Sequence, residues 1–557
     1  MLENTHTNIT NENTYKRTEA LWVCFVSIMV GVAYYPTLLG DYVPQDQWRA
    51  FKYSLEPGLP GDRLGACFSQ TSKFYFLTGR WLVWIGECVE HAAVEQISDF
   101  MPLRVFVLLI VILSAILFRR VLKNIFDSSP VATVLAVMVV LLPGYAFMYY
   151  QGLTGTPVLL ALAFSLLSFS FISHALTAEE RGRKLYINLL TGGLFFIAAC
   201  FIYPIFAFAV IPMAFIFSAF RAESLFGKRV YLCIKLCFFY AFVALTYYLT
   251  VKSGIAIAEY LGKSIPDLKS YQMEINTNPS DLAVRLNIIS REITVMAMAN
   301  VSHLPMWLSI IIFLAPSGII YFEGQRLGWG LSGSIIAATT YSIGVPIIAL
   351  ASMAPWFFSH FPGVAYRHIL PVHFFLILSF GILLARGIET VKRLFSKNAG
   401  RRIELMVMLA IIALFSINQI PLSQHQVADS TIEINHMRAA YREMVANGRF
   451  WELKEIHIIR PKIGRDFTGH RIDREFAPAT MANPEHILQM THAVLRETLS
   501  PAEQKRVHLM DCRFDRNCAI SAPQNALVIS QSKFGTPLPD IRKNHAIIDF
   551  SQLNKAP

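Results

Sequence analysis

Long apolar segments alternate with short polar ones over the first three quarters of the chain. Windows of roughly 20 apolar residues, long enough to cross a bilayer, recur between residues 20 and 420. Only a helix satisfies the backbone polar groups of such a segment in lipid. The pattern therefore predicts about eleven transmembrane helices, over 20–40, 102–118, 130–149, 156–176, 186–201, 204–220, 231–251, 304–321, 331–352, 369–385 and 403–420.

The remaining segment, 421–557, has a different pattern. Short apolar runs at 456–459, 526–530 and 546–550 alternate with polar clusters and predict strands, whereas 437–447 and 484–499 have helical periodicity. We therefore expect a mainly α fold, in which a polytopic helical bundle precedes a small α/β domain. The predicted parts are a polar tail (1–19), a membrane domain (20–420) and the α/β domain (421–557).

The positions of Lys and Arg predict the orientation of the chain. The polar tail lacks the cleavage pattern of a signal peptide, so the first apolar segment is expected to be a retained helix with its N-terminus inside. Basic residues then fall in alternate loops, as cytoplasmic loops require: Arg119, Arg120 and Lys123; Arg181, Arg183 and Lys184; Arg221, Lys228 and Arg229; Arg326; Arg386, Lys392, Arg393, Lys397, Arg401 and Arg402. With the N-terminus inside, an odd number of helices places 421–557 outside. Two long loops, 41–101 and 252–303, lie on the same side.

The composition excludes several classes of protein. The chain is 54% hydrophobic and 16% charged, which rules out a soluble fold for most of its length. The formal net charge is +11, but the basic residues form short clusters between apolar segments and not one continuous stripe. Nucleic acid is therefore not an expected partner, whereas membrane lipids are.

Cysteines on the predicted outer side indicate an oxidising compartment. Cys67 and Cys88 lie in the first outer loop, and Cys512 and Cys518 lie in the C-terminal segment. We expect Cys512 and Cys518 to form a disulfide more readily than Cys67 and Cys88, and reduced cysteines in both places are the alternative. No spacing of Cys and His resembles a zinc site.

The first outer loop combines an acidic turn with an amphipathic segment. Asp41 and Asp46 follow the first apolar helix, and apolar residues recur at three and four over 74–89, beside a stripe that contains Arg80. This periodicity predicts a helix in the plane of the membrane interface. A helix that packs between transmembrane segments is the alternative.

An acidic turn of the form Asp46-Gln-Trp-Arg49, followed by an interfacial helix that carries Gly79-Arg80-Trp81, resembles the polytopic glucosyltransferases of bacterial O-antigen serotype conversion. More widely, the chain is similar to the GT-C superfamily. The resemblance implies a bacterial inner-membrane enzyme with a periplasmic active site. It also implies a polyprenyl-phosphate donor of a hexose such as glucose, and a cell-surface glycan or lipid-linked precursor as acceptor. The family often has two adjacent acidic residues at the turn, where this chain has Gln45-Asp46, with Asp41 five residues earlier.

Sugar transfer to a hydroxyl requires a base, and a carboxylate in reach of the hydroxyl can serve as one. Asp46 is the first candidate and Asp41 the second. The departing phosphate accumulates negative charge that arginines can stabilise, and the candidate cations are Arg49, Arg80 and Arg367. Snorkelling or loop stabilisation is the alternative role for each arginine.

Residues at outer helix ends complete the predicted substrate site: Tyr150, Gln151, Tyr203 and His368. The tyrosines have the alternative role of an aromatic belt. No cofactor is predicted, and a divalent metal stays an open alternative.

Two other functions fit a polytopic chain. A transporter or flippase of lipid-linked saccharide would place ionisable residues inside the apolar spans and often shows internal repeats, whereas these spans hold almost no ionisable residue and no repeat is apparent. A glycan polymerase or ligase would share the outer arginines and depend less on the acidic turn. We therefore expect a glycosyltransferase.

Overall fold

The computed structural model describes nearly all of the helical bundle and short pieces of the rest. The described residues are 3–39, 42–43, 64–65, 67–68, 79–94, 96–126, 128–150, 152–177, 182–220, 225–260, 280, 282–284, 286–287, 306–357, 369–446, 455–459, 490–491, 493–495, 497, 508–511, 526–530 and 546–549.

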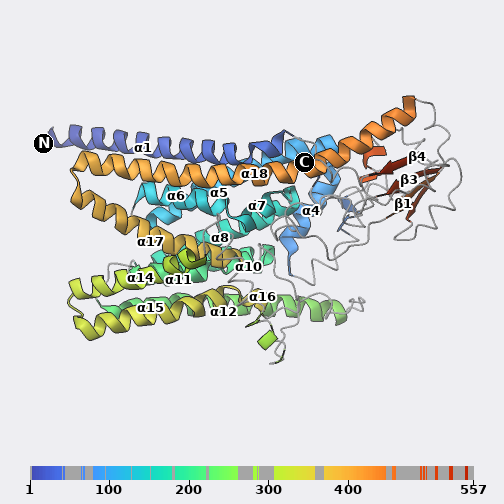
Figure 1. Cartoon of the computed structure of the whole chain (residues 1–557). Helices are drawn as coiled ribbons and strands as arrows, with labels where there is room; N and C mark the ends of the chain where they lie inside the picture. The colour runs from blue at the N-terminus through green and yellow to red at the C-terminus, as the bar shows by residue number, and fades with distance from the viewer. Residues whose placement is uncertain are drawn as a thin grey trace.

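Helices lie side by side along one common direction, and the strands lie beyond one end of them (Figure 1). We call the end beside the strands the outer end, and the opposite end, which holds the start of α1, the inner end. In chain order the helices are α1 (Glu3–Tyr34), η1 (Tyr35–Leu38), α4 (Trp81–Ala93), η3 (Ile97–Asp99), α5 (Phe100–Phe126), α6 (Ser129–Val140), α7 (Pro143–Tyr150), α8 (Gly152–Thr177), α9 (Arg183–Ile202), α10 (Pro204–Ala207), α11 (Val210–Phe220), α12 (Phe226–Tyr260), α14 (Met306–Arg326), α15 (Gly330–Ser352), α16 (Ala354–Phe357), α17 (Leu370–Leu394) and α18 (Lys397–Ala446).

Within the described residues, seven helical segments are long and apolar enough to cross a membrane. They are Glu19–Leu38, Ile97–Phe126, Gly155–Thr177, Arg183–Ile202, Phe226–Ile257, Gly330–Ser352 and Leu370–Leu394. The chain is therefore a mainly α, multi-pass membrane protein, as the apolar pattern predicts.

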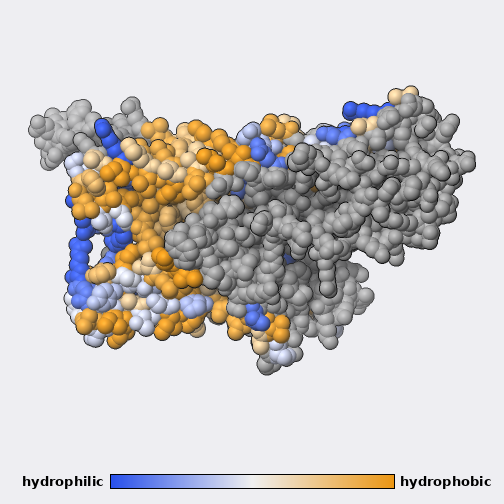
Figure 2. Space-filling model, viewed as in Figure 1, coloured by the Kyte–Doolittle hydropathy of each residue, from blue (hydrophilic) through white to orange (hydrophobic). Residues whose placement is uncertain are grey.

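The surface and the interior of the bundle are both apolar. Every residue of α6 from Val131 to Val140 is buried, while large side chains such as Leu113, Leu190 and Phe238 are exposed on other helices. Figure 2 shows the exposed apolar side chains as a broad orange area over the helices. A helix that is apolar towards its neighbours and towards the surface suits a lipid environment, where packing and not water exclusion holds helices together.

The last predicted membrane helix is longer than expected. The segments 403–420 and 437–446 belong to one helix, α18, so the expected domain boundary at residue 421 lies inside a helix. Pro421 is the only proline in α18, and the half of the helix that follows it contains no glycine. Val427, Ile434, Met437 and Tyr441 recur there at helical spacing and are buried. This apolar stripe keeps the helix intact after it leaves the bundle.

A four-stranded sheet follows α18. Its order is β2-β1-β3-β4, for β1 (Glu455–Ile459), β2 (His508–Asp511), β3 (Ala526–Ser530) and β4 (Ala546–Asp549). All three pairings are parallel, with Glu455 opposite His508 and Ala526. Strands β1, β3 and β4 coincide with the three predicted strands, whereas β2 was not predicted, because its four residues include only two apolar ones.

Charged side chains join three helices at the inner end of the bundle. The carboxylate of Glu19 on α1 pairs with Arg119 at 2.6 Å and with Lys123 at 2.8 Å, both on α5. It also accepts a hydrogen bond from Ser129 of α6 at 2.8 Å. Arg119 is buried, so loss of its partner would leave a charge with reduced solvation.

We predict that Glu19→Gln destabilises the bundle by roughly 2 to 3 kcal/mol, somewhat less than a fully buried pair would. Glu389→Gln is the matched control, because Glu389 pairs with Arg386 and Arg393 in an exposed position on α17; it should change stability by less than about 1 kcal/mol. Thermal unfolding of both variants in one detergent provides the comparison. Equal unfolding temperatures for the two variants would contradict a structural role for Glu19.

Candidate functional site

Hydrogen bonds fasten the outer end of α1 to α6 and α7. The Tyr34 hydroxyl donates to the carbonyl of Val140 at 2.5 Å, and the hydroxyls of Thr37 and Tyr149 lie 2.7 Å apart. The rings of Tyr34 and Tyr149 are in contact, with centroids 4.3 Å apart. Because Tyr34, Thr37 and Tyr149 are all buried, the chain leaves α1 from a fixed position.

A buried arginine fixes the beginning of the first outer loop. Arg104 of α5 donates one hydrogen bond to the carbonyl of Thr37 at 3.4 Å and another to the carbonyl of Tyr42. Its guanidinium also lies 3.7 Å from the centroid of the Tyr42 ring. Burial raises the pKa of the Tyr42 phenol more than the Arg104 charge lowers it, so the contact is a cation–π interaction with a neutral ring. We call these three residues the Arg104 clamp; Tyr42 directly follows Asp41.

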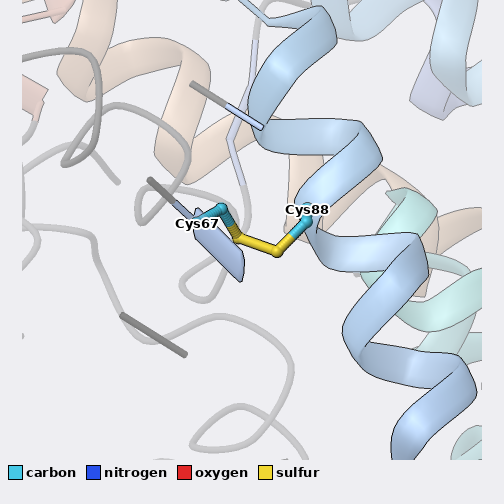
Figure 3. The surroundings of a disulfide bond; sticks show 2 residues. All are labelled: Cys67 and Cys88. Atoms are coloured by element: carbon cyan, nitrogen blue, oxygen red, sulfur yellow. A yellow bond between two sulfur atoms is a disulfide. The ribbon is translucent and has the colours of Figure 1, made fainter. Parts of the chain in front are cut away.

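A disulfide fixes another part of the same loop. Cys67 is bonded to Cys88 of α4, with their Cα atoms 5.5 Å apart (Figure 3). Both cysteines are fully buried, beside the rings of Phe68 and Trp84, whose centroids are 5.0 Å apart. The pair rated lower, Cys67–Cys88, is therefore bonded. The disulfide expected between Cys512 and Cys518 stays a prediction, because both cysteines lie outside the described residues. A bond that closes a loop of this length contributes about 3 kcal/mol and persists in an oxidising compartment.

Within the range predicted as an amphipathic helix, 74–89, the structure describes α4, which runs from Trp81 to Ala93 and packs against α8 and α9. Gly79 precedes it with a φ of 65°, a left-handed conformation that favours glycine. Val83 and Cys88 are buried, while Leu82 and Val89 are exposed. The helix thus packs on the bundle and also presents an apolar face to its surroundings, so the two alternatives are compatible.

Two predicted substrate-binding residues, Arg80 and Tyr203, come together beside α4. The guanidinium carbon of Arg80 lies 4.7 Å from the centroid of the Tyr203 ring. Tyr203 is buried and joins α9 to α10. Next to this pair, Trp81 stacks on Phe201 at 4.4 Å and Phe201 contacts Tyr247 at 5.1 Å. We call Arg80, Trp81, Phe201, Tyr203 and Tyr247 the Arg80 cluster.

The Arg80 cluster has the chemistry of a phosphate and sugar site. A half-buried guanidinium offers forked donors to a phosphate, and it is less strongly hydrated than a lysine ammonium. Aromatic rings with polar tips pack well where one side of a ligand is apolar and the other is wet. The cluster therefore places a guanidinium beside aromatic rings at the outer end of the bundle.

The other predicted site residues are outside the part of the chain that the structure describes: Asp41, Asp46, Arg49, Gln151, Arg367 and His368. For Tyr150 only the backbone is described, as the last residue of α7. The described neighbours Tyr42 and Ile369 are both buried. Ile369 directly follows His368 and precedes α17, which contacts α10. The chain on either side of these residues is thus anchored at the outer end.

Three buried charged residues at the outer end were not among the predicted site residues. Arg104 lies near the end of an apolar helix that the sequence predicts to be outside, where the positive-inside rule does not explain a cation. A cation at a predicted outer helix end is the signal that could have found Arg104. Glu87 and Glu90 on α4 are 3% and 0% exposed. Their spacing of three residues places them on one face of the helix. The sequence alone does not show that this face is buried.

No group of three metal-binding side chains occurs among the described residues. Comparison with protein-family models, with curated proteins and with solved structures finds no match to this chain.

We predict that Arg104→Met loosens the first outer loop, because two carbonyls lose their buried donor at about 1 to 3 kcal/mol each. Arg120→Met is the control, since Arg120 is exposed on the same helix. Hydrogen exchange measured by mass spectrometry should accelerate in peptides that contain Tyr42 in the first variant only. Unchanged exchange in Arg104→Met would show that the clamp does not hold the loop.

Proposed function

We propose that this chain is a glycosyltransferase of the GT-C type in a bacterial inner membrane. It moves a hexose, such as glucose, from polyprenyl phosphate to a cell-surface glycan or its lipid-linked precursor at the periplasmic face. The Arg80 cluster is the observation that carries the proposal. It places a cation and a buried aromatic ring together at the outer end of the bundle, where a lipid phosphate and its sugar would lie.

The proposed topology has about eleven membrane crossings, with 421–557 as a periplasmic α/β domain. Each of the predicted spans overlaps a helix or a consecutive helix pair of the structure. The Cys67–Cys88 disulfide supports an oxidising compartment for the first outer loop. The parallel sheet supports an α/β domain, because parallel strands require long crossover connections.

The proposed reaction is a displacement at the anomeric carbon. Asp46, or Asp41 in its place, removes the proton of the acceptor hydroxyl while the oxygen of that hydroxyl forms the new bond to the anomeric carbon. The bond between the anomeric carbon and the phosphate oxygen breaks, and polyprenyl phosphate leaves with the electron pair. Arg80 stabilises the charge that builds up on the phosphate, and Arg49 and Arg367 are proposed to do the same.

A transporter is the rival proposal, and the positions of buried charges favour the enzyme. A transport path would need ionisable residues near the middle of the membrane. In the described chain, the buried arginine, histidine and acidic residues on the long helices lie within about two turns of a helix end: Arg104, Arg119, Arg229, His373 and Glu404. A polymerase or ligase would use the same outer arginines and is distinguished by its tolerance of changes in the acidic turn.

We predict that Asp46→Asn lowers hexose transfer by roughly a hundredfold or more, because it keeps the side-chain shape and removes the base. Arg367→Ala should weaken donor binding as well as turnover, since its charge meets the phosphate before and during the reaction. Transfer from radiolabelled polyprenyl-phosphate hexose in isolated membranes measures both effects.

Glu389→Gln serves as the control substitution, because Glu389 lies near the inner end of α17. Near-normal transfer by Asp46→Asn would reassign the base to Asp41. Full activity of the Asp41→Asn, Asp46→Asn double variant would exclude the carboxylate mechanism and favour a polymerase or ligase.

A further inference from the structure

An apolar cavity of about 130 Å³ lies between α11, α12, α14 and α15, in the inner half of the bundle. Phe215, Ile320, Ala337 and Tyr341 form part of its almost wholly apolar wall. Ile234 also borders it and is 59% exposed on the outside of α12. The cavity therefore adjoins the lipid-facing surface, and a molecule dissolved in the bilayer can reach it.

The turn between α14 and α15 places Trp329 at this cavity. Gly328 and Gly330 flank the tryptophan, with φ values of 77° and 70° that favour glycine. A side chain at Gly324 would put its Cβ 2.6 Å from the Trp329 ring. Three glycines thus give the indole its position in the cavity wall.

The inner end of the cavity is positively charged. Arg229 lines it, is buried, and lies with its guanidinium carbon 5.1 Å from the Trp329 ring centroid. It donates to the Ala219 carbonyl at 2.7 Å and pairs with Glu323 at 3.5 Å. Glu323 also pairs with Arg386, which in turn pairs with Glu389 at 2.9 Å. These two guanidinium groups are therefore matched by two carboxylates, and further positive charge comes from lysine and arginine side chains beside them. Lys228 and Arg326 are exposed nearby in the chain, and Figure 2 shows hydrophilic side chains gathered at this edge of the apolar band.

We propose that this cavity binds an acyl chain of an anionic phospholipid from the inner leaflet, with the lipid phosphate near the cluster of Arg229, Glu323 and Arg386. The apolar wall accepts hydrocarbon, and the exposed border at Ile234 gives access from the bilayer. The exposed positive charges of Lys228 and Arg326 select an anionic head group, as basic pockets on the cytoplasmic side of membrane proteins do. The acyl chain of a zwitterionic lipid would also fit the cavity, but its head group would not neutralise the positive charge beside it. This site is separate from the Arg80 cluster and does not depend on the proposed reaction, but its assignment to the inner leaflet rests on the proposed topology.

Brominated lipids test the proposal, because bromine on an acyl chain quenches a neighbouring indole. The full chain is reconstituted in vesicles of phosphatidylcholine that contain a small fraction of chain-brominated phosphatidylglycerol or, separately, chain-brominated phosphatidylcholine. The Trp329 signal is the difference between the fluorescence of the wild type and that of Trp329→Phe. We expect stronger quenching of this signal by the brominated phosphatidylglycerol.

Variants separate the cavity from general contact with the membrane. Ala337→Phe, or the smaller change Ala337→Leu, should fill the cavity and abolish the quenching, whereas Ile336→Phe on the exposed face of α15 should leave it unchanged. Lys228→Gln and Arg326→Gln should each weaken the preference for the anionic lipid by about fivefold.

Quenching that persists in both Ala337 variants would overturn the cavity as the binding site. Equal quenching by the two brominated lipids would overturn the proposed preference for an anionic head group.

Discussion

A buried guanidinium in an apolar bundle must find its acceptors inside the protein, and the position of Arg104 follows from this constraint. Its acceptors are the carbonyls of Thr37 and Tyr42, one at the end of α1 and one in the loop beyond it. An unmade hydrogen bond at this depth costs far more than a made one contributes. The end of α1, the outer part of α5 and the start of the acidic turn are therefore held as one unit.

The same constraint explains where polar chemistry lies in the rest of the chain. At the inner end, Arg119 meets Glu19, and Arg229 meets Glu323. At the outer end, Arg80 lies against Tyr203, and the disulfide holds the loop on α4. The helices between these two ends pack through apolar contacts. The inner arginines pair with carboxylates, and Arg229 also lies against the Trp329 ring, whereas Arg80 and Arg104 lie against tyrosine rings.

Sequence reasoning predicted those features that depend on local periodicity. Spans such as 331–352 and strands such as 526–530 follow from runs of apolar residues, and both are present. Arg80 and Tyr203 were both predicted to belong to the substrate site, but their contact was not predicted. Periodicity carries no information on how α4 meets α9. The Cys67–Cys88 bond was rated too low for the same reason: distance along the chain says little about distance across a folded loop. The extension of α18 through Pro421 was missed because a proline in a polar stretch usually marks a helix boundary.

The central claim is that the outer end of the bundle performs group transfer and does not move lipid. Proteoliposomes that carry polyprenyl phosphate with a radiolabelled hexose, together with acceptor glycan, test it most directly. The account predicts that label passes from the lipid to the glycan and that free polyprenyl phosphate appears in equal amount. Movement of the intact labelled lipid between leaflets, without release of polyprenyl phosphate, would contradict the account and identify a transporter.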